Sequence, residues 1–167
     1  MQDKLLSDLL DVLTREYEKY GKLQNTADKK KEALIENEVE KLADIVQKED
    51  EIITEIENLE DKRSDLIKQL LNIYEIDEEE LNYRELTGYL PEKWKEKFDP
   101  VRNNLLEIID SLHEKNEENR LLLQEAVKVN NFSINMLQRA LEPVSNTYNK
   151  KKKSETKQGY NIVDRRA

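Results

Sequence analysis

The sequence predicts an all-α fold, with an elongated antiparallel helical hairpin, a long third helix in a coiled-coil-like three-helix bundle, and a mobile C-terminal tail. Apolar residues recur at helical spacing over long proline-free stretches. The 167 residues include only three glycines and three prolines, so helices are rarely interrupted. Charged residues make up 39% and hydrophobic residues 37%. This composition predicts a thin core, formed as a seam between long solvated helices.

The region from Leu5 to Leu71 is expected to be helical. Its first half places apolar residues on one face, namely Leu6, Leu9, Leu13, Tyr17, Tyr20, Ala27 and Leu34. Its second half alternates steps of three and four more strictly, through Leu42, Ile45, Glu49, Ile52, Ile56, Leu59, Arg63, Leu66 and Leu70. Two charged residues interrupt that seam. Glu49 and Arg63 either fix the register of the seam or lie at its edge with their charges in water.

A single helix over this region would be about 100 Å long. The alternative, which we favour, is a hairpin with a turn near Glu36–Glu38. Apolar spacing changes phase there, and Asn37 followed by Glu40 resembles a helix N-cap with a capping box. We therefore expect two antiparallel helices.

The rest of the chain is predicted to hold a short helix, a long helix and a tail. Pro91 suits the first turn of the long helix, and Pro100 inside it predicts either a kink or a break. Periodicity is lost beyond Pro143. The expected helices are about 3–35, 38–72, 77–87 and 92–142, within a domain over residues 1–142 followed by a flexible basic tail over 143–167.

An ideal helix over residues 92–142 carries an apolar face along its whole length, which we call the first stripe. Its members are Trp94, Phe98, Val101, Leu105, Ile109, Leu112, Asn116, Asn119, Leu123, Val127, Ile134, Leu137 and Leu141. We expect this face to pack against the first two helices.

A second stripe lies about 120° from the first and exists only in the last third of the helix. Its members are Leu122, Ala126, Val129, Phe132, Met136 and Ala140. Together the stripes widen the apolar arc to about 220°. Either another part of the chain covers the second stripe, such as the first helix or the short helix, or it receives the amphipathic helix of a partner. We favour the partner, because Met and Phe adapt to surfaces of differing shape.

The sequence resembles the FlgN family of flagellar export chaperones. The resemblance depends on Asn116-Glu-Glu-Asn119-Arg-Leu-Leu-Leu, the apolar helix that follows, and Thr147-Tyr148 with a short apolar and basic ending. The charged helical pair with its turn near Asn37 is similar to the N-terminal hairpin of that family. The family often has a glycine shortly after the tyrosine, whereas this chain has Asn149 and four lysines.

The resemblance implies a cytoplasmic helical chaperone domain that binds the C-terminal helix of hook–filament junction proteins, prevents their premature assembly and delivers them to the type III export gate. It implies that the cargo binds late on the last helix, where the second stripe lies. It also implies that Tyr148 contacts the export gate. The alternative for Tyr148 is an ordinary aromatic residue of the tail.

Catalysis is not expected, and neither cofactor nor metal is predicted. The chain has no cysteine and a single histidine, His113, so a nucleophile–base pair or a zinc site lacks its components. Glycines occur only at positions 21, 88 and 159, which excludes a glycine-rich phosphate loop. No apolar run is long enough to span a membrane, and the N-terminus lacks the features of a signal peptide.

Two further function classes remain open at this level. Both stripes could close a homodimer or larger coiled-coil assembly. The tail from Lys150 onward has seven basic and two acidic residues, a charge of +5 that leaves −14 on the rest of the net −9 chain. The tail could contact nucleic acid, but the acidic body argues against a nucleic-acid surface.

Overall fold

The computed structural model describes residues 2–75 and 88–141, and within these ranges every regular element is a helix. The helices are α1 (Gln2–Ile35), α2 (Val39–Tyr74) and α4 (Glu92–Leu141). The all-α prediction is confirmed. The expected short helix at 77–87 and the tail at 143–167 lie outside the described residues, so the division into a helical domain and a tail stays a prediction. The chain divides into two units after Asn130. The packing of α1, α2 and the first part of α4 belongs to the first unit.

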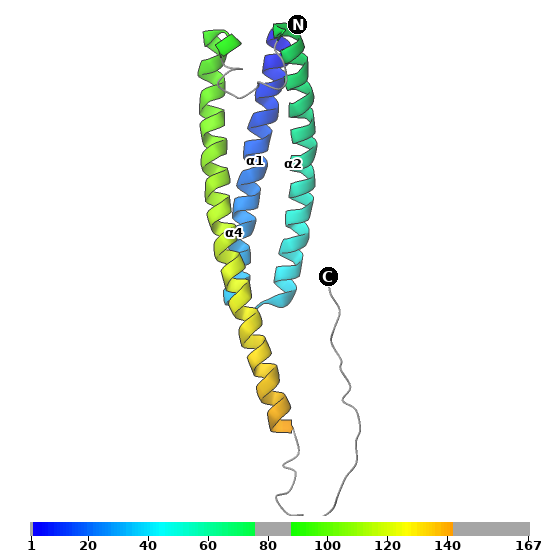
Figure 1. Ribbon diagram of the computed structural model, residues 1–167, viewed down its shortest axis with the longest axis vertical. Coiled ribbons are helices and arrows are strands. Elements are labelled where there is room, and N and C mark those ends of the chain that lie inside the picture. The colour runs from blue at the N-terminus through cyan, green and yellow to red at the C-terminus, as the bar shows by residue number, and fades with distance from the viewer. Residues whose placement is uncertain (1, 76–87, 142–167) are drawn as a thin grey trace, which may run out of the picture. The chain divides into compact units, whose positions relative to one another are not determined.

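α1 and α2 form the expected antiparallel hairpin (Figure 1). The turn differs from the prediction in the role of Asn37, which ends α1 instead of starting α2. Asn37 has a φ of 56° and ends α1, with the Glu38 amide donating to the Ala33 carbonyl and the Asn37 amide to the Leu34 carbonyl. This is a Schellman arrangement, and asparagine tolerates its left-handed conformation. The predicted N-cap role of Asn37 was wrong, because α2 begins after Glu38 without a side-chain cap.

The seam predicted on α2 is present in the structure. Leu42, Ile45, Glu49, Ile52, Ile56, Leu59, Arg63, Leu66 and Leu70 are all buried or half-buried. On α1 the seam passes through Glu16 and Leu23, whereas the predicted Tyr17 is exposed.

Two ion pairs join α1 to α2 inside this seam. The Arg63 guanidinium donates to the Glu16 carboxylate at 2.6 Å, and the Lys30 ammonium pairs with Glu49. Glu16 is fully buried, and burial raises the pKa of its carboxyl above the ordinary value, opposed by the neighbouring Arg63. Glu49 and Arg63 therefore act as seam residues rather than as charges held out in water. The two pairs lie two heptads apart along each helix, and α1 supplies the acidic residue of one pair and the basic residue of the other. A hairpin in which α2 is displaced along α1 would therefore lose both pairs.

The N-terminal part of α4 packs along α1 and runs parallel to it. Trp94 donates from Nε1 to the Asp3 carboxylate at 2.8 Å, while the Lys93 ammonium contacts the other carboxylate oxygen at 3.1 Å. These two contacts lower the pKa of Asp3, with the Trp94 hydrogen bond as the larger cause. Trp94 and Phe98 are buried in a cluster with Leu6, Leu9 and Leu70 of the hairpin and with Leu90, which lies just before α4. A second cluster further along the bundle consists of Leu23, Ala27, Ile56 and Leu112.

Pro100 does not break α4, which is one continuous helix through this position. Proline has no N–H to donate to the preceding turn, so one backbone hydrogen bond of the helix is missing here. Packing of Phe98 and Leu105, which are both buried, holds the helix on either side of the proline.

Candidate partner-binding surface on α4

The register between α1 and α4 determines where the apolar face of α4 loses its cover. Gln24 donates to Ser111, Lys115 to Asp28 and Lys31 to Glu118, and each pair is separated by 87 residues. In this register, the last residue of α1, Ile35, corresponds to Leu122. The second stripe therefore begins at the position where α1 ends.

Most of the second stripe is exposed. Val129, Phe132 and Met136 are 61%, 64% and 54% exposed, and Ala140 is exposed as well. Leu122 and Ala126, nearest the end of α1, are half-buried. Among the described residues, α1 does not cover these side chains. The short helix over 77–87, the other cover considered, lies outside the described residues. Large apolar side chains gathered on one exposed helical face are typical of an interaction surface.

The first stripe departs from the prediction at two upstream positions and throughout its last third. Trp94, Phe98, Leu105, Leu112 and Asn119 are buried, whereas Ile109 is 40% exposed and Asn116 is exposed as well. Beyond Asn119, Leu123 and Val127 are each about half exposed. Ile134, Leu137 and Leu141 are 51%, 62% and 78% exposed. The expectation that this stripe packs on the first two helices along its full length was wrong, because its members beyond Asn119 are about half exposed or more. Apart from the half-buried Leu122 and Ala126, both stripes are thus exposed over the last twenty residues of α4.

Charges are few on this part of α4. Between Leu121 and Leu141 the ionisable residues are Glu125, Lys128 and Arg139. Lys128 pairs with Glu125 at 2.6 Å along the same helix. Arg120 and Glu117 form a similar pair at 2.8 Å just before the exposed segment. The segment can therefore bury apolar area against a partner while desolvating few charges.

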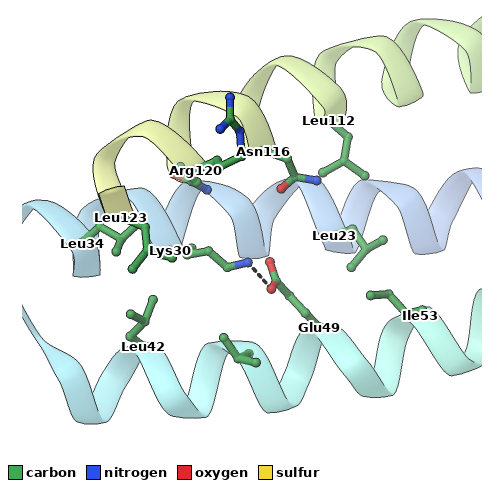
Figure 2. Close-up of a pocket in the computed structure, with 12 residues that line it drawn as sticks. Leu23, Lys30, Leu34, Leu42, Glu49, Ile53, Leu112, Asn116, Arg120 and Leu123 are labelled. Atoms are coloured by element: carbon green, nitrogen blue, oxygen red, sulfur yellow. Dashed lines mark ion pairs between the residues drawn. The ribbon is translucent and has the colours of Figure 1, made fainter. Parts of the chain in front are cut away.

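An open groove of about 440 Å³ lies between the three helices of the first unit (Figure 2). Its apolar lining comes from α1, α2 and α4, namely Leu23, Leu34, Leu42, Val46, Ile53, Leu112 and Leu123. The Lys30–Glu49 ion pair crosses it from α1 to α2, as the dashed line in Figure 2 shows. At this end of the bundle α4 leaves part of the hairpin's apolar face uncovered.

Asn116 and Asn119, which carry the family resemblance, both line this groove. The Asn119 side chain is buried and donates from Nδ2 to the Ala27 carbonyl at 2.8 Å, while its Oδ1 has no partner. This contact ties α4 to α1 at the last buried position of α4. We interpret Asn119 as a residue that fixes the position of α4.

The sequence reasoning missed Glu16 and Lys30. Continuing the strict alternation of three and four from Leu13 would have reached Glu16 instead of Tyr17, and later Lys30. Their charges are complementary to those of Arg63 and Glu49 in antiparallel order, which is the signal that could have identified them. The predicted gate contact, Tyr148, lies outside the described residues.

Over residues 2–75 and 88–141, no cluster of three or more metal-ligating side chains occurs. None of the described helices combines the length and hydropathy required to cross a membrane.

Comparison with known proteins identifies the family. The chain matches the family described as FlgN protein over residues 1–156. Neither the search of curated proteins nor the search of solved structures gives a match. The matched range includes α1, α2, α4 and Tyr148. The chain belongs to the FlgN family and is a flagellar export chaperone.

Proposed function

We propose that this chaperone binds the C-terminal helix of hook–filament junction proteins with the exposed end of α4. In this proposal the bound helix is kept from assembling prematurely, and the complex delivers its cargo to the type III export gate. The observation that supports it is the exposed second stripe, which begins where α1 ends. The cargo-binding residues are Leu122, Ala126, Val129, Phe132, Met136 and Ala140.

Hydrophobic burial would supply the affinity. Burying a side chain such as Phe132 or Met136 stabilises a complex by about 1.5–3 kcal/mol. Part of that gain offsets the cost of association and of ordering the cargo helix. The expected dissociation constant is therefore roughly micromolar to nanomolar, which lets the complex come apart at the gate. Glu125, Lys128 and Arg139 beside the second stripe would set specificity.

Delivery to the export gate is assigned to Tyr148, on the family resemblance. The chain would act in the cytoplasm, where the cargo is made, and would carry out no catalysis. No cofactor is needed for this function.

Paired aspartate substitutions test the cargo site. Phe132→Asp with Met136→Asp should weaken binding to the C-terminal segment of a hook–filament junction protein by at least about a hundredfold, since two apolar contacts are lost and two charges are buried. The matched control is Gln124→Glu with Asn135→Asp, which adds the same charge on the polar face of the same helix. Calorimetric titration of the three proteins would compare their affinities. Equal affinity in the wild type and the Phe132/Met136 variant would remove the structural basis of the proposal.

A structural homo-oligomer is the alternative function. The same exposed stripes support it, because a second copy could cover them. In that case the cargo segment would not bind, and the free protein would have a defined oligomeric mass.

A further inference from the structure

The upstream part of α4 shows how wide an arc this helix buries against two neighbours. From Trp94 to Asn119 its fully buried residues are Trp94, Phe98, Leu105, Leu112 and Asn119. Half-buried residues flank them on both sides, with Lys95 at one edge and Ser111 at the other. On an ideal helix these positions span about 200°. This is the arc that α4 presents to α1 and α2 together.

The downstream part of α4 presents an apolar arc at least as wide. From Leu122 to Leu141 the first and second stripes span about 220°, from Phe132 at one edge to Val127 at the other. An amphipathic helix that packs against one neighbour needs an apolar stripe of only about 100°. A single bound helix would therefore leave one of the two stripes in water.

We propose that the end of α4 receives two packed helices from one partner, in the form of a helical hairpin, with one helix along each stripe. This inference rests on the proposed function and specifies the form of the cargo. The apolar arc continues the face by which α4 already packs on the α1–α2 hairpin, so the partner's hairpin would form a three-helix bundle with α4 in the same manner.

Charge indicates which partner helix faces which stripe. Glu125, Lys128 and Arg139 all project near Phe132, at the outer edge of the second stripe, and together carry a net charge of +1. The outer edge of the first stripe has uncharged Asn131 and Gln138 instead. Upstream, the edges of α4 are matched to α1 by cross-helix pairs such as Lys115–Asp28 at 2.5 Å and Lys31–Glu118 at 2.8 Å. The partner helix on the second stripe is thus expected to carry an acidic residue opposite Arg139. The partner helix on the first stripe is expected to carry uncharged polar residues opposite Asn131 and Gln138.

Thiol labelling can test both stripes, because the chain contains no cysteine. Single variants Ile134→Cys on the first stripe, Met136→Cys on the second stripe and Asn135→Cys on the polar face would each be mixed with a full-length hook–filament junction protein. The labelling rate would be compared with and without that protein, and light scattering would give the mass of each complex. Circular dichroism would check that each variant keeps its helical content.

A one-to-one complex should slow labelling at both 134 and 136 by about tenfold or more, since the core of an interface excludes solvent. Labelling at 135 should change by less than about twofold. Protection of only one stripe would overturn the hairpin inference while leaving the proposed function intact. Protection of both stripes in a complex with two copies of this chain would also overturn it, because a second copy would then cover one stripe. Absence of any complex would contradict the inference and the proposed function together.

Discussion

Replacing Arg63 with methionine leaves the buried Glu16 carboxylate without its counter-ion. Breaking a buried ion pair costs about 3–5 kcal/mol when the remaining charge stays buried. Glu16 can instead take up a proton, which limits the cost. From the ordinary pKa of 4.5, protonation at pH 7 costs about 3.4 kcal/mol, and at pH 5.5 about 1.4 kcal/mol. Because Arg63 is 36% exposed, water already screens part of the pair. We expect Arg63→Met to lower the free energy of unfolding by about 2–3 kcal/mol at pH 7 and by about 1 kcal/mol at pH 5.5.

The sign of the pH dependence follows from the direction of the pKa shift. Burial raises the pKa of Glu16 in the folded protein, so the folded state holds more protons than the unfolded chain between the two pKa values. The contribution of Glu16 to stability therefore falls as pH rises from about 4.5 through its folded pKa. Loss of Arg63 raises that folded pKa further and deepens the fall.

Urea unfolding followed by circular dichroism at pH 5.5 and pH 7 measures these free energies. Arg15→Met is the matched control, since Arg15 pairs with Asp11 at the surface and its loss should cost less than about 0.5 kcal/mol at either pH. Combining Arg63→Met with Glu16→Met should restore the wild-type value, because an apolar pair replaces a buried ion pair at little cost. An equal loss at both pH values for Arg63→Met would refute the reasoning, as would a loss no larger than that of the control.

Three further changes have defined outcomes. Asn119→Leu should change the free energy of unfolding by less than about 1 kcal/mol, since an unpaired buried oxygen is removed together with the bond to Ala27. Asn119→Asp should cost at least about 2 kcal/mol in urea unfolding, because it buries a carboxylate that cannot donate to the Ala27 carbonyl. Pro100→Ala should raise the thermal midpoint, because it restores a backbone donor worth about 1–3 kcal/mol inside α4, and an unchanged midpoint would contradict this. Trp94→Phe should raise the pKa of Asp3 toward its ordinary value of 3.8 in an NMR titration, because the hydrogen bond from Trp94 is the larger cause of the lowered pKa. In the wild type, Asp3 contributes stability above pH 3.8, and this contribution is lost as pH falls through the folded pKa of Asp3.

The helices and the α2 seam were predictable because they depend on local periodicity. Charged residues at seam positions keep the alternation of three and four, so spacing identified Glu49 and Arg63 as seam positions. Spacing left open whether their charges lie in water, and only the partners on α1 decide this. The α1 seam was harder to predict, because the aromatic Tyr17 was assigned to the seam position that the charged Glu16 occupies. Asn37 suits either end of a helix, and only the backbone conformation decides between them.

The extent of the exposed surface could not be predicted from the sequence. The first stripe continues unchanged through Leu123 to Leu141, whether or not another helix covers it. Its exposure depends on the register between α1 and α4, which the three pairs separated by 87 residues determine. Such contacts between distant parts of the chain do not change the spacing of apolar residues within either helix. The second stripe, by contrast, was identified from spacing, and its role as the cargo site remains a prediction.

The most direct test of the cargo site is the mass of the protein in solution, alone and with the C-terminal segment of a hook–filament junction protein. Size exclusion coupled to light scattering gives both masses. Our account predicts a free monomer of 19.8 kDa that shifts to a one-to-one complex when the segment is added. A stable oligomer that does not change on adding the segment would contradict it, since the stripes of α4 would then be buried between copies of this chain.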